Sequence, residues 1–359
     1  MKPRLSLNPH DPGHTSWADG AHCRQAIRTG SRSFHTASLL LPQSMRWPAH
    51  AMYAFCRQAD DAIDEAVDPE LAIAEMYERL NLIYAGTPHD SPADRAFADI
   101  VVRFAIPRCV PDALLEGFCW DTMGRKYETL SDVVAYAVRV ASTVGVMMTL
   151  VMGRREREVL ARAADLGIAM QLTNIVRDIG EDAGNGRLYL PRAMMREAGL
   201  SPDTWLARPE FCPAIARVAA RLLAVADGYY QRSQAGIAAL PARCRPSIRA
   251  AGMIYAEIGR EIERNGMDSV NRRAVTSKAR KIALLMRAMS GGGLTGNSRQ
   301  PHKAEAPEAS FLLDAVENEQ APWVFQATLK PMWDYNEWGG DLFGLLTRVE
   351  QRKQTRQAG

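Results

Sequence analysis

Residues 171–182 read Q-L-T-N-I-V-R-D-I-G-E-D, a stretch in which polar and apolar residues alternate at helical spacing. Its polar residues are spaced three, four and four apart, which places them on one face of a helix: Gln171, Asn174, Asp178 and Asp182. The other face carries Leu172, Ile175, Val176 and Ile179. Carboxylates stacked on a buried helix repel one another unless a cation lies between them, and Mg²⁺ prefers oxygen ligands that bridge to phosphates. The stretch predicts a metal-binding helix face, and the alternative is a solvated acidic face.

A second copy of the pattern lies near the N-terminus, where residues 52–64 read M-Y-A-F-C-R-Q-A-D-D-A-I-D. Asp60 and Asp64 are one helical turn apart, with Arg57 one turn before Asp60 and Tyr53 one turn before Arg57. Each acidic stretch therefore has an arginine close by, Arg57 or Arg177. We expect the two helices to face each other across a cavity, where carboxylates bind metal ions and arginines bind phosphate oxygens in fork geometry.

These stretches resemble the two aspartate-rich motifs of the head-to-head trans-prenyltransferases, the squalene and phytoene synthases. Three more segments resemble family motifs in the expected order: S-R-S-F (31–34) followed by L-L-P (40–42), Y-A-V-R-V-A-S-T-V-G (136–145) and G-R-L-Y-L-P (186–191). The resemblance covers roughly residues 20 to 290, and within the family it is greatest to the bacterial phytoene synthases.

The helical periodicities and the lack of a long strand pattern predict an all-α chain. The resemblance implies the architecture, a single-domain isoprenoid-synthase bundle around a central cavity. We expect a flexible segment at residues 1–18, a catalytic domain at 19–290 and a linker with a C-terminal extension at 291–359. Helices are predicted to start near Ala21, to run from Pro48 to about Glu65, and to span 70–85, 93–106, 133–153, 157–182, 213–237 and 245–264, with another opening at Pro111.

Composition limits the class of protein further. The chain has 359 residues, 47% of them hydrophobic, so it can bury a large core. A formal net charge of +3 is too mild to indicate nucleic-acid binding. Six cysteines without a C-x-x-C pair indicate reduced thiols in a cytoplasmic protein. No secretory signal is visible, and we expect no membrane span, since none of the apolar runs approaches about 20 residues.

The predicted site residues fall into three groups. The metal ligands are Asp60, Asp64, Asn174, Asp178 and Asp182, with Mg²⁺ as the metal and Mn²⁺ as an alternative. The substrate-binding residues are Ser31, Arg32, Ser33, Phe34, Tyr53, Arg57, Gln171, Asn174, Arg177 and, from family position, Arg273. The catalytic residues are Asp60, Asp64, Asp178, Asp182 and Tyr255, the last supplying a polar group on an apolar helix face.

The resemblance implies that two geranylgeranyl diphosphates condense through prephytoene diphosphate to phytoene, the entry step of C40 carotenoid biosynthesis. No NADPH is expected, because no G-x-G-x-x-G pattern follows a strand. The alternatives are a C30 dehydrosqualene or squalene synthase, a head-to-tail prenyltransferase or terpene cyclase, and a catalytically silent assembly subunit. Isoprenoid diphosphates are the expected partners, together with peripheral contact to the inner face of the membrane and a downstream phytoene desaturase.

Three further features carry expectations. Phe34, Ala37, Ser38 and Leu41 form a predicted inward-facing stripe, and serine at position 38 favours a C20 substrate. Ala141, Ser142 and Gly145 let another backbone or an isoprenoid chain approach closely. The basic cluster at 272–281 is a solvated helix start, a contact to anionic membranes or part of the diphosphate site.

Overall fold

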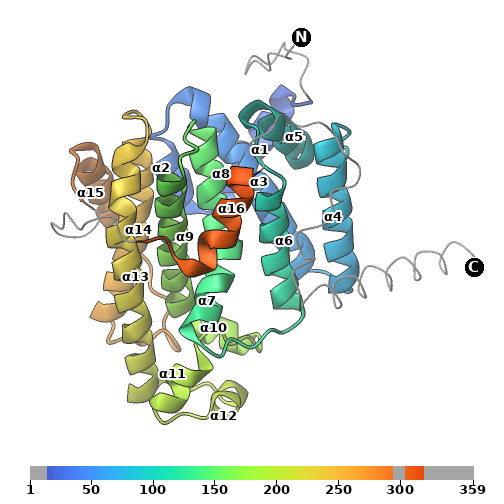
Figure 1. Cartoon of the computed structure of the whole chain (residues 1–359). Coiled ribbons are helices and arrows are strands. Elements are labelled where there is room, and N and C mark those ends of the chain that lie inside the picture. Colours follow the sequence, from blue (N-terminus) through green and yellow to red (C-terminus); the bar gives the residue numbers. More distant parts are fainter. Residues whose placement is uncertain (1–13, 294–303, 319–359) are drawn as a thin grey trace, which may run out of the picture.

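The computed structural model describes residues 14–293 and 304–318 (Figure 1). Within these ranges the chain contains helices and no strand, which confirms the all-α prediction. The elements are α1 (Trp17–Gly30), α2 (Arg32–Ser38), α3 (Gln43–Asp64), α4 (Pro69–Ala85), α5 (Pro92–Phe104), α6 (Cys109–Thr122), α7 (Leu130–Ala137), the π-helix η1 (Val138–Ser142), α8 (Thr143–Val151), α9 (Arg157–Arg177), α10 (Ile179–Gly184), α11 (Arg192–Glu197), α12 (Pro202–Ala207), α13 (Pro213–Ala239), α14 (Arg245–Arg264), α15 (Lys278–Met289), the 3₁₀ helix η2 (Pro307–Ala309) and α16 (Ser310–Asn318).

Helix α9 is the centre of the bundle, with α13 and α14 packed on one side and α8 and η1 on another (Figure 1). Its predicted apolar face is buried: Leu172 and Val176 are completely covered, and Ile175 is 3% exposed. Small residues let α9 approach its neighbours. A Cβ atom on Gly167 would lie 2.6 Å from the Cα of Ser142, and one on Gly145 would lie 2.9 Å from the carbonyl oxygen of Ala163. The predicted close backbone approach at 142 and 145 is therefore present.

The second motif does not form one continuous helix. Helix α9 ends at Arg177, and α10 begins at Ile179 after a break at Asp178, whose φ is −103°. The break coincides with a long-range contact, because the backbone of residues 269–270 lies directly against Gly180. The amide of Gly180 donates to the carbonyl of Ser269 at 3.0 Å, and a Cβ on Gly180 would lie only 2.1 Å from the carbonyl oxygen of Val270. The expectation of a single helix over 157–182 was wrong at this position.

Two other predicted helices differ from the sequence pattern. Helix α3 begins at Gln43 instead of Pro48, so that Pro48 is buried inside the helix. The 133–153 stretch begins at Leu130 as α7 and widens into the π-helix η1 before it continues as α8. Both departures lie beside the cavity described below, and π-helical turns are common at functional sites.

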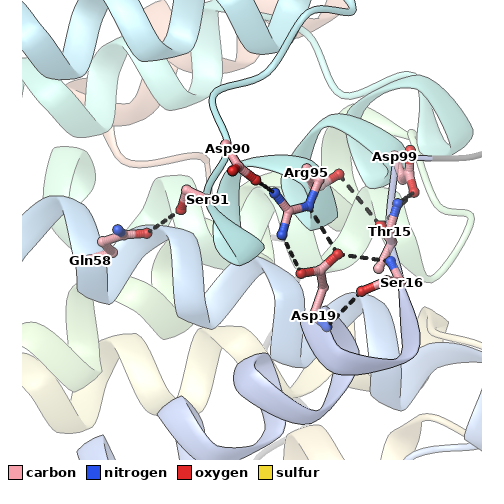
Figure 2. Close-up of polar contacts among 8 residues, drawn as sticks. All are labelled: Thr15, Ser16, Asp19, Gln58, Asp90, Ser91, Arg95 and Asp99. Carbon is pink, nitrogen blue, oxygen red and sulfur yellow. Dashed lines mark hydrogen bonds and ion pairs between the residues drawn. The ribbon is translucent and has the colours of Figure 1, made fainter.

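A polar network fixes the start of α1 to α5 (Figure 2). Ser16 caps α1, and the carboxylate of Asp19, 1% exposed, accepts from Arg95 on α5 at 2.6 Å. Arg95 also pairs with Asp90, and Asp99 accepts from the backbone amide of Thr15 at 2.9 Å. Helix α1 therefore begins four residues before the predicted Ala21, and residues 14–16 are held against the body.

The predicted extension includes a packed segment. In α16, Leu312, Leu313 and Val316 are buried, and the helix contacts α6 and α9. Arg157 at the start of α9 pairs with three carboxylates of the segment, Glu305 at 2.6 Å, Asp314 at 2.7 Å and Glu317 at 2.8 Å. The division at residue 290 stays a prediction, but residues 304–318 pack on the helical bundle. The aromatic residues Trp323, Phe325, Trp333, Tyr335 and Trp338 lie outside the described residues.

Two described helical stretches are long and apolar enough to cross a membrane, residues 130–151 and α9, which corrects the expectation that no such stretch exists. Both are central elements of the bundle, and 61% and 72% of their apolar windows are buried inside it. Length and composition alone do not distinguish a membrane span from the core helix of a folded bundle. All six cysteines lie in the described part of the chain, and none of them forms a disulfide there.

Candidate active site

A cavity of about 650 Å³ runs between the two motif helices and into the bundle. Most of the predicted site residues line it: Ser31, Arg32, Ser33, Phe34, Tyr53, Arg57, Asp60, Gln171, Asn174, Arg177, Tyr255 and Arg273. Asp64, Asp178 and Asp182 are outside the lining. Asp178 bonds to the lining residues Arg177 and Arg273, Asp64 is close enough to Asp60 to raise its pKa, and Asp182 lies near Asp178. The two acidic stretches, more than a hundred residues apart in the chain, therefore meet at one end of one cavity.

Arginines at the polar end hold several of the carboxylates. Arg57 pairs with Asp61 at 2.6 Å and approaches Asp60 at 3.7 Å. Asp178 accepts from Arg177 and from Arg273, each at 2.8 Å. These bonds lower the pKa of Asp178 although its burial acts in the opposite direction. The guanidinium of Arg273, which was assigned to the site from family position, therefore reaches Asp178 of the second motif.

Two other carboxylates lie in an environment that disfavours their charge. Burial, followed by the nearby Asp64, raises the pKa of Asp60 to about 6. Burial, followed by Asp178 and Glu181, raises the pKa of Asp182 to about 7. Partly buried carboxylates beside other carboxylates are stabilised by a cation, and they bind it in their ionised form.

The side chains of this region suit a divalent cation whose coordination is completed by the substrate. The Oδ1 atom of Asn174 is buried in the cavity wall with no hydrogen-bond partner, which leaves a hard oxygen donor beside Asp178. Among the described residues, no three acidic, histidine or cysteine side chains gather closely enough to hold a metal by themselves. Mg²⁺ is commonly bound by one or two carboxylates together with substrate phosphates, so a site completed by diphosphate agrees with this geometry.

Aromatic and hydroxyl groups form the next layer of the cavity. Ser31 caps α2 by accepting from the amide of Phe34, so residues 31–34 lie at a helix start. The ring of Phe34 stacks on Tyr255 with centroids 5.1 Å apart and meets Tyr53 edge-on at 6.4 Å. Burial raises the pKa of both tyrosines, that of Tyr53 to about 12, so both hydroxyls are protonated at neutral pH. A Cβ on Gly30 would lie 2.5 Å from the Tyr53 hydroxyl, so any other residue at position 30 would displace that hydroxyl.

The far end of the cavity is apolar. Leu41, Ala49, Met152, Val159 and Leu240 belong to a small buried cluster, and all of them line the cavity there. Phe34, Ala37, Ser38 and Leu41 line it along one side, which confirms the predicted inward stripe. The cavity therefore has a charged end and an apolar interior, as a diphosphate with a hydrocarbon chain requires.

Four residues near the polar end were absent from the predicted site. Arg187 pairs with Asp64 at 2.8 Å, and Asp121 accepts from the hydroxyls of Tyr136 at 2.7 Å and Tyr189 at 2.8 Å. Burial raises the pKa of Asp121 to about 6 in spite of these two bonds. Tyr136 opens one family-like segment, and Arg187 and Tyr189 lie in another, G-R-L-Y-L-P, so these motifs were a signal that could have marked them.

An all-helical bundle with two acidic motifs, several arginines and an apolar cavity defines a transferase of the isoprenoid-synthase class. The comparisons specify it further. The chain belongs to the squalene/phytoene synthase family, whose pattern matches residues 27–280.

Several characterised relatives are similar over most of their length. The phytoene synthase of Cereibacter sphaeroides is 50% identical over 312 residues, which cover 83% of this chain and 88% of the relative. That of Rhodobacter capsulatus is also 50% identical, with coverages of 83% and 90%. Among solved structures, a ligand-bound dehydrosqualene synthase is 29% identical, with a TM-score of 0.70 and coverages of 76% and 96%. The predicted family and the isoprenoid-synthase fold are thereby confirmed.

Proposed function

We propose that this chain is a phytoene synthase, which condenses two geranylgeranyl diphosphates head to head through prephytoene diphosphate to phytoene. The observation that carries the proposal is the single cavity that joins both acidic motifs to an apolar interior. The names of the relatives at 50% identity support phytoene as the product. The catalytic domain is proposed to occupy residues 19–290, with residues 304–318 packed against it.

The charged end of the cavity is proposed to bind the diphosphates. Arg57, Arg177 and Arg273 supply guanidinium groups that match phosphate oxygens, and Ser31, Arg32 and Ser33 lie at the start of α2 beside them. Asp60, Asp64, Asn174, Asp178 and Asp182 are the proposed ligands of Mg²⁺, or of Mn²⁺ in its place. When bound, the metal neutralises the diphosphate, so that it becomes a leaving group.

The remaining wall is proposed to protect and hold the allylic chain. Phe34, Tyr53 and Tyr255 present aromatic rings next to the charged end, where positive charge develops as the diphosphate departs. Val140, Ala141, Val144 and Met148 line the cavity from η1 and α8 and exclude water that would quench the cation. Gln171 lies between these two regions on α9. No reductant enters the proposal.

The proposed surroundings follow from the substrates. The prenyl chains of the substrates and the whole of the product are hydrophobic, so we propose a cytoplasmic protein in peripheral contact with the inner face of the membrane. A phytoene desaturase is the proposed next enzyme, because it would take up the product.

The test is incubation of the full-length protein with C15 and C20 diphosphates in the presence of Mg²⁺ and absence of NADPH, followed by mass analysis of the products. The proposal expects a C40 hydrocarbon from the C20 substrate and release of diphosphate that depends on the metal. A C30 product from the C15 substrate alone would instead support the dehydrosqualene synthase alternative, whose solved representative is 29% identical, less than the 50% of the phytoene synthases. Failure to release diphosphate from either substrate would support the silent subunit.

A further inference from the structure

Helix α15 has apolar side chains on its outward face as well as on its packed face. Leu284 and Ala288 are buried against α14, and Arg249 of α14 donates to the carbonyl of Ala288 at 2.8 Å. On the opposite side, Ile282, Met286 and Met289 follow the helical spacing i, i+4, i+7 and are 61%, 61% and 49% exposed. A surface helix ordinarily carries polar residues on this side, so the outward face needs an explanation.

The exposed apolar residues of the structure concentrate here. Nine large apolar side chains are exposed among the described residues, and four of them lie between positions 275 and 289: Val275, Ile282, Met286 and Met289. Single exposed apolar residues are normal on any protein surface, whereas a contiguous group on one helix indicates an interaction site.

The same segment is strongly basic. From position 269 to 304 the sequence contains eight lysines and arginines and no aspartate or glutamate. Arg273 and Arg280 are used inside the structure, in ion pairs with Asp178 and Glu257. Lys278 and Arg287 are exposed and form no ion pair with any described residue, and both lie on the helix that carries the apolar face. An apolar face with basic residues beside it is complementary to an anionic lipid surface.

The position of α15 links this surface to the cavity. The segment that leads into the helix, Arg273 to Thr276, lines the cavity together with Lys281. Within that segment, Val275 lines the cavity and is 72% exposed. Figure 1 shows α15 at the periphery of the bundle, beside α14 and away from α4 and α5.

We propose that the outward face of α15 (Ile282, Met286 and Met289, flanked by Lys278 and Arg287) is the surface by which this protein docks on a bilayer of anionic lipids. The docked protein then has the 273–276 wall of its cavity at the lipid surface, so that hydrocarbon chains pass between bilayer and cavity with little exposure to water. This inference rests on the proposed function for the identity of those chains, but the docking itself does not depend on it.

The experiment is co-sedimentation of the full-length protein with vesicles of phosphatidylcholine alone or of phosphatidylcholine and phosphatidylglycerol in equal parts. We expect binding to the anionic vesicles that falls as NaCl increases. The variant I282S/M286S should lose about tenfold or more of its partitioning, because each removed side chain no longer inserts into the bilayer. The variant K278E/R287E should bind anionic vesicles at least about fivefold more weakly for each changed position. Near an anionic surface, each basic residue increases membrane partitioning by about that factor.

A matched variant tests the surface itself. V102S/M123S removes two exposed apolar side chains from α5 and the end of α6, and it should bind the vesicles like the parent protein. Turnover of detergent-dispersed substrate should be unchanged in all three variants, whereas turnover of vesicle-embedded substrate should fall in the two α15 variants only. Turnover of detergent-dispersed substrate therefore tests the proposed function independently of membrane docking.

Two results would overturn the proposal. One is a parent protein that stays in the supernatant with anionic vesicles. The other is vesicle binding that the α15 variants retain in full, or that V102S/M123S loses equally. If, in addition, the α15 variants changed the molar mass in solution without lipid, the face would belong to an interface between copies of the chain.

Discussion

The guanidinium of Arg187 lies 2.8 Å from the carboxylate of Asp64, although the two residues are 123 positions apart. This ion pair joins the loop after the second acidic motif to the last residue of α3, which carries the first motif. Both side chains are more than a third exposed, so the pair contributes little to stability. Because Arg187 lies beside the proposed metal ligand Asp64, we propose that it contacts a diphosphate bound between the motifs.

We expect Arg187→Gln to lower kcat/KM by about tenfold or more, because a hydrogen bond to a charged group contributes about 1.5–3 kcal/mol. Arg187→Lys keeps the charge and should lose less. The matched control is Arg196→Gln, which removes an exposed arginine of α11 that pairs with Glu128. Steady-state kinetics measure the effect, and an Arg187→Gln enzyme with unchanged kcat/KM would exclude a role in binding diphosphate.

Asp60→Asn and Asp178→Asn should each lower turnover about a hundredfold or more, because charge stabilisation by a bound metal contributes several kcal/mol. Each change removes a charge and keeps the side-chain volume. Asp178 also holds Arg177 and Arg273, so circular dichroism and thermal unfolding must show that the variant is folded. Asp90→Asn, an exposed carboxylate paired with Arg95, is the control. Turnover near that of the parent protein at saturating Mg²⁺ in either variant would mean that the metal lies elsewhere.

The sequence predicted those elements whose pattern is local. The spacing of Leu172, Ile175 and Val176 gave the buried face of α9 correctly, because helical period and burial are coupled over a few residues. The break at Asp178 could not be predicted in this way, since it depends on the contact of Gly180 with residues 269–270. The ion pair between Arg187 and Asp64 could not be predicted either, because it also joins residues that are far apart in the sequence.

Residues 304–318 illustrate a different limit. Their proline and charged residues are typical of a linker, and the apolar positions Leu312, Leu313 and Val316 span only about one helical turn, too short for a periodic signal. Arg157 stabilises the segment from α9, which local composition cannot reveal. Most predicted cavity-lining residues were identified because the family motifs mark them, and Asp121 was missed because it stands outside every motif that was used.

Leu312→Ala should reduce the free energy of unfolding by about 2–5 kcal/mol, the usual cost of truncating a fully buried leucine. The prediction tests whether residues 304–318 belong to the folded body. Urea denaturation of the full chain measures it, with the exposed Val102→Ala as a control that should change the value by less than about 0.5 kcal/mol. Equal stability of the Leu312→Ala and parent proteins would show that the segment does not pack stably.

The stability of the protein should depend on pH through His50. Burial, with His35 and two arginines nearby, lowers the pKa of His50 to about 4 from its usual 6.5. The unfolded chain therefore binds more protons than the folded one between these two values. The contribution of neutral His50 is complete above pH 6.5 and is lost as the pH falls towards 4, by up to about 3 kcal/mol.

His50→Gln isolates this effect from the acidic residues, which titrate in both proteins. Between pH 7.5 and pH 4.5 the variant should lose about 2 kcal/mol less stability than the parent protein, as measured by urea denaturation at each pH. The same loss in both proteins would mean that His50 is protonated in the folded state.

Substrate length is predicted to depend on Ser38. Its side chain lines the cavity between Phe34 and Leu41, and its hydroxyl donates to the carbonyl of His35 at 2.8 Å and lies 3.1 Å from Nε2 of His50. Because serine is small, the path into the apolar end stays open for a C20 chain. Ser38→Phe would place a ring across that path.

We expect C20 turnover to fall sharply in Ser38→Phe while C15 turnover survives or rises, because a filled cavity excludes only the longer chain. Ser38→Ala removes the hydroxyl and its bonds without adding bulk, so it should retain the C20 preference. Kinetics with both substrates, together with product mass analysis, distinguish these outcomes. Equal loss on both substrates in Ser38→Phe would indicate general overpacking, which costs about 1–3 kcal/mol of stability, and Ser38 would then have no part in selecting chain length.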